Sequence, residues 1–242
     1  MGVRLKNLLE ESLVLLLRQP KLFVPKLISS FLGSAYVIFL FERFLLPSLK
    51  TGVPSSSLTV LAAILGASLV LTFVGFAAPV MVASMVKNSY GLKKSFLDTL
   101  RLFFQLVKAS MLFYLLIIFI SLPAVLGVFL ALKGFLSALL PGLAISLILI
   151  LLVTFAAYFF PITLLNEEKV GEGLKESWGA AQKRSNSVGV LTLFSLMMLL
   201  FVGVLSSELR YLGYAGFLAG RILSTVINTY VFVISPRFYL ES

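Results

Sequence analysis

Two short patterns meet in one stretch, residues 154–178, which reads TFAAYFFPITLLNEEKVGEGLKESW. The stretch opens with Thr-[Phe/Tyr]-x5-Pro and closes with Leu-[Lys/Glu]-[Lys/Glu]-Ser-[Leu/Phe/Trp]. Each pattern occurs three times in the chain. Copies of the first begin at Thr72, Thr154 and Thr229, and copies of the second place their serine at Ser12, Ser95 and Ser177.

The spacing of these copies indicates an internal repeat. The serines are 83 and 82 residues apart, and the threonines are 82 and 75 residues apart. Twice the proline of one pattern precedes the serine of the other by 16 residues, from Pro79 to Ser95 and from Pro161 to Ser177. Two unlike patterns that keep one period are typical of a repeated structural unit. We therefore interpret residues 1–242 as one membrane domain with repeats at about 4–87, 88–168 and 169–242.

Composition assigns the chain to the membrane proteins. Sixty per cent of its residues are hydrophobic, 12% are charged, and the mean hydropathy is +1.06. A soluble domain has about 25% charged residues. Uncharged apolar runs such as 110–132 and 136–165 reach the ~20 residues that a helix needs to cross a bilayer. Because a helix bonds its own backbone, and no alternating ten-residue strands occur, we predict an all-α integral membrane protein.

Each repeat is expected to contain an amphipathic interfacial helix, a span, a turn and a second span. The stripe Leu92, Phe96, Leu100 and Phe103, for example, has helical spacing, with lysines off it. Since each unit has two spans, all three enter the membrane in the same direction, which predicts pseudo-threefold packing about the membrane normal. The six predicted spans are 27–47, 58–86, 109–132, 136 or 142 to 165, 188–205 and 214–235, and the interfacial helices lie within 4–26, 92–108 and 174–181.

The distribution of basic residues predicts the orientation. Fifteen of the 20 lysines and arginines fall in the N-terminal segment, the second-to-third and fourth-to-fifth connections and the C-terminus. Only Lys50, Lys133 and Arg210 fall in the opposite loops. We therefore expect a plasma-membrane protein whose termini and interfacial helices are cytoplasmic. The net charge of +10 is expected to meet anionic lipid headgroups, not nucleic acid, because acidic residues interrupt the basic ones.

The residue inventory excludes several kinds of chemistry. The chain has no cysteine and no histidine, so disulfides, thiolate or imidazole metal ligands and catalysis by these side chains are excluded. P-loop, Gly-x-Ser-x-Gly and dinucleotide fingerprints are missing. Asp98 is the only aspartate, and the adjacent carboxylates Glu167 and Glu168 are a weak metal motif. We expect no catalytic site, no metal and no cofactor.

The predicted sixth span carries the candidate binding residues. Arg221, Thr225 and Asn228 follow one another at i, i+4 and i+7, so they share one helix face. Glu42 is predicted at a similar depth in the outer leaflet, which makes a Glu42–Arg221 pair a hypothesis. The alternative is that Arg221 reaches out to the interface while Glu42 pairs with Arg43 or meets water. The polar face is likewise either a ligand lining or a set of interhelical hydrogen bonds.

Residues 166–194 resemble a family of membrane proteins. Glu167-Glu168, then Gly173-Leu174-Lys175-Glu176-Ser177-Trp178, then Lys183-Arg184 precede a span. This run is similar to the YciC-like proteins and the membrane domain of some glycerophosphodiester phosphodiesterases, in which an acidic residue, Ala/Gly-Leu-x-x-Ser-Trp and basic residues precede a span. The resemblance implies six spans and says little about function, since most members have none assigned.

The sequence leaves two hypotheses for the function of the protein. The first, which the sequence favours because it shows few charges within the spans and no recognisable site, is a non-enzymatic membrane scaffold or accessory subunit that acts through a protein partner. The second is a transporter or channel for a lipid or small amphiphile, while an enzyme acting on lipid has little support. A transporter requires a cavity lined by Arg221, Thr225 and Asn228, whereas a scaffold should be packed solid there.

Overall fold

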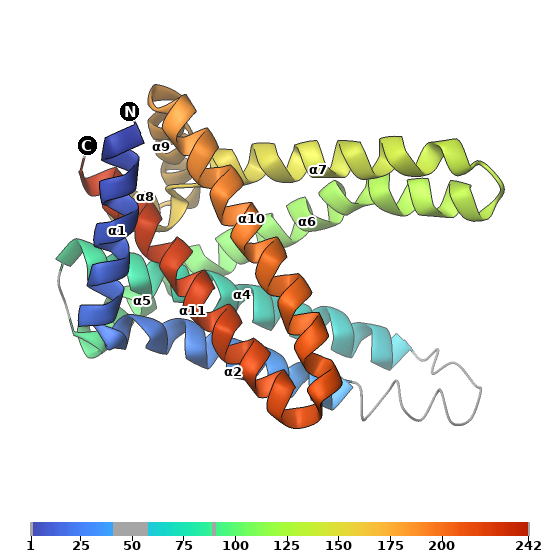
Figure 1. The fold of residues 1–242 in the computed structure, drawn as a ribbon, viewed down its shortest axis with the longest axis horizontal. Coiled ribbons are helices and arrows are strands. Elements are labelled where there is room, and N and C mark those ends of the chain that lie inside the picture. The colour runs from blue at the N-terminus through green and yellow to red at the C-terminus, as the bar shows by residue number, and fades with distance from the viewer. Residues whose placement is uncertain (1, 41–57, 89–90, 242) are drawn as a thin grey trace.

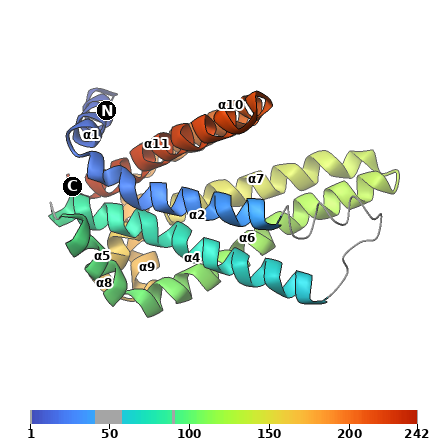
Figure 2. The same cartoon turned by 90° about the horizontal axis from the view of Figure 1, so that it is seen from below.

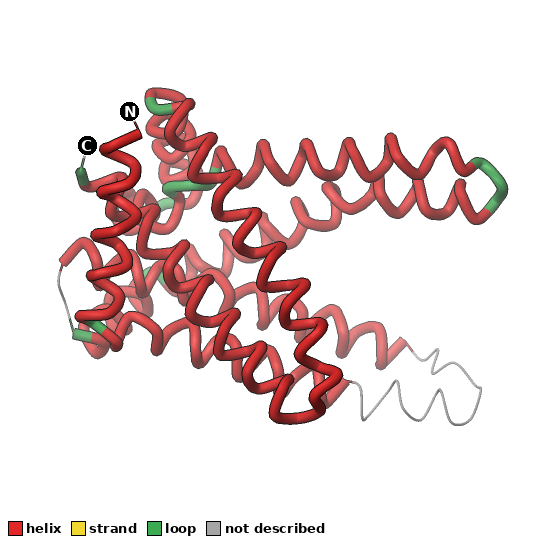
Figure 3. Tube along the Cα trace, in the orientation of Figure 1, coloured by secondary structure: helices red, strands yellow, loops and turns green. Residues whose placement is uncertain are grey.

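The computed structural model describes residues 2–40, 58–88 and 91–241. These residues form helices almost throughout, with no strand among them (Figure 3), which confirms the all-α prediction. The helices in order are α1 (Gly2–Arg18), η1 (Pro20–Phe23), α2 (Val24–Leu40), α4 (Leu58–Asn88), α5 (Leu92–Arg101), α6 (Phe103–Leu132), η3 (Leu136–Ala138), α7 (Leu139–Ala156), α8 (Phe160–Glu167), α9 (Val170–Lys183), α10 (Ser185–Leu209), η4 (Arg210–Leu212) and α11 (Gly213–Leu240).

Five described helical stretches are long and apolar enough to cross a membrane. This finding supports a membrane-embedded, multi-pass protein. Of the predicted first span, 27–47, only the part within α2 is described, and the loop 48–57 lies outside the described residues. The five stretches are Ser68–Asn88, Phe103–Leu132, Leu136–Ala156, Ser185–Leu209 and Ala215–Leu240.

The long helices pair as hairpins that diverge from one another. α2 pairs with α4, α6 with α7, and α10 with α11. The hairpins start near the two chain termini and separate with distance from them, so that α6–α7 projects away from α10–α11 (Figures 1 and 2). Only 11% of the most apolar windows of α6 and of α7 is buried, against 39% for α4. The apolar faces of the α6–α7 hairpin are therefore left uncovered by the rest of the described chain.

The core lies where the hairpins converge. We call this packed end, built from α1, α5, α8, α9 and the adjoining ends of the long helices, the base, and the opposite hairpin ends the tips. The largest fully buried side chains include Phe159 and Phe160, which join different clusters of this core. The buried clusters are Leu8, Ala83, Tyr158, Phe159, Ile162, Ala181, Val188, Leu191 and Ile234; Val80, Leu102, Leu106, Ala109, Phe113, Phe160 and Leu164; and Leu16, Leu22, Val82, Met85 and Val233.

The helices α1, α5 and α9 of the base each bury a small residue, and α1 also buries Leu8 and Leu16. α1 packs on α11, α5 on α4, and α9 on α8. The pattern serines Ser12, Ser95 and Ser177 are all fully buried in these contacts. The predicted apolar stripe of α5 is only partly used in packing. Leu92 packs against the third cluster, whereas Phe96 and Leu100 are exposed and the buried residues of α5 are Ser95 and Thr99.

The fourth span is interrupted, which corrects the prediction of one span ending at residue 165. α7 ends at Ala156, and α8 begins only at Phe160. Pro161 lacks an N–H and its ring clashes with the carbonyl four residues earlier, so the helix opens there. Ser177 Oγ accepts from the N–H of Phe159 (3.2 Å) and donates to the carbonyl of Ala156 (2.8 Å). Ser235 Oγ donates to the carbonyl of Tyr158 (2.5 Å), so the open backbone is bonded by side chains.

A serine performs the same task within the α6–α7 hairpin. Pro123 lies inside α6, where a proline disturbs the helical hydrogen bonds. Ser146 of α7 accepts from the N–H of Ala124 (3.1 Å) and donates to the carbonyl of Ile120 (2.7 Å). Those two backbone groups would bond each other in a regular helix. Ser146 therefore bridges the disturbed turn of α6.

Replacing Ser177 with alanine should destabilise the protein by about 1–3 kcal/mol, since it leaves buried backbone groups unpaired. Ser12→Ala and Ser95→Ala are matched controls. These serines occupy the same pattern position and are equally buried, yet their Oγ atoms make no hydrogen bond to the described part of the chain. Unfolding in detergent by heat or denaturant measures the difference. Equal losses in all three variants would contradict the assigned role of Ser177.

Candidate functional site

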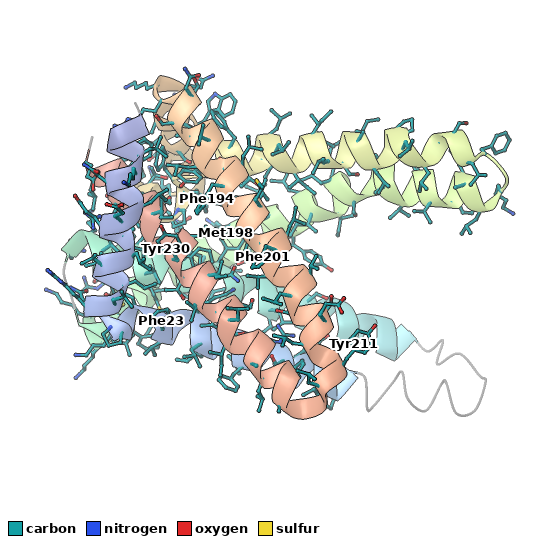
Figure 4. All side chains as sticks on the ribbon, viewed as in Figure 1. Phe23, Phe194, Met198, Phe201, Tyr211 and Tyr230 are labelled. Carbon is teal, nitrogen blue, oxygen red and sulfur yellow. The ribbon has the colours of Figure 1, made fainter. Side chains whose placement is uncertain are left out.

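The predicted polar face lies on α11, towards the tip of the α10–α11 hairpin. Thr225 is buried, and Arg221 and Asn228 are half-buried. Glu42 lies outside the described residues, so the Glu42–Arg221 pair stays a prediction. The tip beyond the site carries Tyr211, which is 86% exposed (Figure 4).

The base end of the same hairpin is closed by aromatic packing. The rings of Phe194 on α10 and Tyr230 on α11 lie edge to face, 6.5 Å between centroids (Figure 4). The Tyr230 hydroxyl donates to the carbonyl of Leu9 in α1, at 3.0 Å. The Arg221 face therefore lies between an exposed tip and a tightly packed base.

Two of the polar side chains are bonded within α11 itself. Thr225 Oγ1 donates to the carbonyl of Arg221 (2.9 Å). Asn228 Nδ2 donates to the carbonyl of Ser224 (2.7 Å) and to its Oγ (3.1 Å). Bonds of this kind lower the cost of placing hydroxyl and amide groups in an apolar environment. They also fix which way the side chains point.

Two cavities flank Arg221, and they differ in polarity. The first, about 270 Å³, lies between α10 and α11 and includes Ser206, Ser224 and Asn228 in its lining. The second, about 240 Å³, lies between α2 and α11 and has a mostly apolar lining. Arg221 lines both cavities. The apolar lining consists mainly of Leu27, Phe31, Ala35, Ile38, Phe217, Leu218 and Ile222.

The structure thus divides the predicted trio between two sites. Asn228 joins Arg221 in the polar cavity, and Thr225 joins it in the apolar one. The guanidinium carbon of Arg221 lies 5.2 Å from the centroid of the Phe217 ring, and Phe217 also lines both cavities. A guanidinium over an aromatic face is attracted by the ring quadrupole. This contact helps to hold the cation at the boundary between the two cavities.

Sequence reasoning missed the contribution of α10 to this site. Ser206 Oγ donates to the carbonyl of Gly220 (3.2 Å), and a Cβ on Gly220 would lie 3.3 Å from the Cα of Ser206. Gly203 lines the polar cavity one turn away. The available signal was the pair Gly216 and Gly220, one turn apart in α11, which marks close helix contact.

A second polar cluster lies at the base, on α8, α9 and α11. The Tyr239 hydroxyl donates to Glu176 Oε1. The pKa of Glu167 is raised above its ordinary 4.5, mainly by a hydrogen bond to Glu176. Some loss of solvation and the negative charges of Glu176 and Glu172 raise it further. The Lys169 ammonium opposes this rise and lies 2.9 Å from Glu172 Oε1. The protonated form of Glu167 is therefore favoured relative to that of an isolated glutamate.

Replacing Glu167 with glutamine should flatten the pH dependence of stability at the base. A carboxyl group whose pKa is raised by folding stabilises the fold below its ordinary pKa, and this contribution is lost as pH rises through the raised value. We therefore expect the wild type to lose stability relative to Glu167→Gln as pH rises from about 4.5. Thermal unfolding across that range measures this. Glu10→Gln, an exposed control on α1, should keep the wild-type profile, and a shared profile for all three proteins would contradict the assignment.

Comparison of the chain with family models, with curated proteins and with solved structures finds no match. The function is accordingly argued from the geometry of the cavities.

Proposed function

We propose that this protein is a non-enzymatic, multi-pass membrane protein that binds and moves a lipid or small amphiphile with an anionic head. The observation that carries the proposal is the position of Arg221, between a cavity whose lining includes several polar side chains and a cavity whose lining is mostly apolar. An amphiphile has the same two parts, and the cation lies where they would join.

The chemistry of each cavity favours this class of ligand. A guanidinium remains protonated and binds carboxylate or phosphate oxygens with two parallel hydrogen bonds. Ser206, Ser224 and Asn228 add hydrogen-bonding groups beside it. The cavity between α2 and α11 offers apolar surface to a hydrocarbon chain, whose burial is worth about 0.8 kcal/mol per methylene. A charged side chain is costly to place within a membrane span, so such a residue is a candidate for function.

The membrane arrangement proposed with this function has six spans in three parallel units. Packing at the base supports it, because α1 contacts α11, α5 contacts α4 and α9 contacts α8. Each pattern serine thus lies on a helix that packs against a proline-bearing segment, in a cyclic order. The excess of lysine and arginine supports a plasma-membrane protein with a cytoplasmic base and termini that meet anionic headgroups. Arg221, 15 residues before Pro236, would then lie ~22 Å from the cytoplasmic boundary.

A scaffold or accessory subunit is the second candidate function. The observation that favours it is the low burial of the α6 and α7 windows, 11% each, which leaves apolar surface for a partner helix as well as for lipid. The resemblance of residues 166–194 to the YciC-like proteins stays a prediction and favours neither candidate.

Photolabelling with an anionic amphiphile distinguishes the two candidates. The full chain, in nanodiscs of uncharged phosphatidylcholine, is labelled with diazirine-bearing palmitate, and the adducts are mapped by mass spectrometry. We expect adducts on α2, α10 and α11 around the two Arg221 cavities. Arg221→Gln should reduce them roughly tenfold, because a hydrogen bond to a charged group is worth about 1.5–3 kcal/mol.

Two further variants sharpen this experiment. Arg221→Lys keeps the charge and should restore part of the labelling. Arg101→Gln removes an arginine whose side chain is 83% exposed on α5 and should leave the labelling unchanged. Undiminished labelling in Arg221→Gln would contradict amphiphile binding at this residue and favour the scaffold.

A further inference from the structure

The polar cavity beside Arg221 is larger than a bare anionic group requires. Its volume is about 270 Å³, whereas one water molecule takes about 30 Å³ in the liquid. Gly203 and Gly220 belong to its lining and have no side chains to fill it. A carboxylate or phosphate bound at Arg221 therefore leaves room for a further part of the ligand head.

Asn228 contributes a hydrogen-bond acceptor to this cavity. Its Nδ2 is the donor in both hydrogen bonds of the side chain, to the carbonyl of Ser224 (2.7 Å) and to the Oγ of Ser224 (3.1 Å). A backbone carbonyl can only accept, so the nitrogen of the amide must lie on that side. Asn228 Oδ1 therefore remains as an acceptor for a ligand.

This carbonyl oxygen is accessible. Among the described residues, the side-chain atoms that expose less than 1 Å² and lack a partner include the hydroxyls of Thr192 and Ser195, but not Asn228 Oδ1. Asn228 is half-buried, and of the two cavities beside Arg221 it lines only the polar one. The polar cavity thus has an acceptor in its lining that is not sealed inside the protein.

Ser206 adds a second acceptor from the facing helix, α10. A serine hydroxyl has one hydrogen, and Ser206 Oγ donates it to the carbonyl of Gly220 (3.2 Å). The Ser206 oxygen can then only accept a hydrogen bond from a ligand. The lining therefore combines the guanidinium of Arg221, which binds an anion, with neutral oxygens that need donors.

These acceptors indicate hydroxyl groups on the ligand head. A carboxylate or an ionised phosphate diester has acceptors but no hydrogen to donate. An ammonium group is disfavoured as the donor, because Arg221 places a positive charge in the same cavity and like charges repel. None of the described residues that line the cavity is acidic, so an ammonium would also lack a counter-charge.

We propose that the ligand is a lipid whose head is a phosphate diester with a hydroxyl-bearing second ester group, as in phosphatidylglycerol. Arg221 binds the phosphate, and a hydroxyl of the head donates to Asn228 Oδ1. This inference rests on the proposed function, because it takes the two cavities beside Arg221 as the binding site of an amphiphile. It specifies an anionic polyol head in preference to a fatty acid or a zwitterionic phospholipid.

Two lipids that differ only in hydroxyl groups test this inference. Phosphatidylglycerol and phosphatidylpropanol have the same charge and a three-carbon ester, but only phosphatidylglycerol has hydroxyls. Both lipids, each with a diazirine in an acyl chain, are mixed in equal amounts into phosphatidylcholine nanodiscs that hold the full chain, and their adducts are distinguished by mass. Around Arg221 we expect phosphatidylglycerol adducts to exceed phosphatidylpropanol adducts about fivefold, as one neutral hydrogen bond provides.

The same sample contains an internal control. The most apolar windows of α6 and α7 are only 11% buried, so they meet the surrounding lipid without a built site. Adducts on these two helices should show the two lipids at a ratio near one. Because both lipids are read on the same molecules, a lower folded fraction in a variant does not change the ratio.

Asn228→Leu should bring the ratio around Arg221 close to one without lowering the phosphatidylpropanol adducts. The hydrogen bonds of Asn228 lie within α11, so the helix contacts do not depend on them. Thr229→Val is the matched control. The Thr229 hydroxyl also donates to a carbonyl four residues earlier, that of Thr225 (2.7 Å), but Thr229 lines neither cavity. This variant should keep the wild-type ratio.

The outcomes separate this inference from the proposed function. Arg221→Gln should lower the adducts of both lipids around this residue roughly tenfold, and undiminished labelling would overturn the proposed function and the inference together. Equal labelling by the two lipids that still depends on Arg221 would overturn the polyol head alone. A fivefold ratio that persists in Asn228→Leu would also overturn it.

A soluble competitor identifies the source of the head. Glycerophosphoglycerol has the head of phosphatidylglycerol and no acyl chains. In excess, it should leave the adducts around Arg221 in place, because it gains nothing from the apolar cavity. Displacement of both lipids by this compound would show a soluble polyol phosphate as the ligand and overturn the lipid.

Discussion

The fold depends on one constraint, which is that backbone groups inside a bilayer must be hydrogen-bonded by the protein itself. Pro161 and Pro123 disturb the helical hydrogen bonds near them. Serine hydroxyls from other helices bond backbone groups beside both prolines. Ser177 reaches the open turn from α9. One short helix of the base, α9, thus supplies hydrogen bonds at the place where α7 ends and α8 begins.

Because the buried contacts are concentrated at the base, the helices are less tightly packed elsewhere. The buried clusters occupy the base, whereas most of α6 and α7 faces outward. Cavities form where diverging helices no longer fill the space between them, beside Arg221 and at the convergence of the proline segments. A polar side chain at such a place, such as Asn228 beside Arg221, can meet a ligand without entering a continuous core.

The sequence was informative about features that belong to one helix. Hydropathy predicted the apolar helices, and the repeated pattern singled out Ser12, Ser95 and Ser177, all of which are buried. Helical periodicity placed Arg221, Thr225 and Asn228 on one face, but it could not tell that they line two different cavities. Features that several helices form together were not predicted from the sequence. The break before Pro161 was missed because α4 and α11 continue through Pro79 and Pro236 with the same pattern. The two different cavities beside Arg221 depend on helix crossings that no single-helix periodicity encodes.

The length of the α6–α7 hairpin gives the molecule a mechanical property. α6 has 30 residues, which corresponds to about 45 Å at the rise of an α-helix. A rotation of about 10° at its anchored end would displace the free end by about 8 Å, by simple leverage on that length. A displacement of the free end therefore corresponds to a much smaller movement near the anchored end, where Phe113 of α6 packs on Phe160.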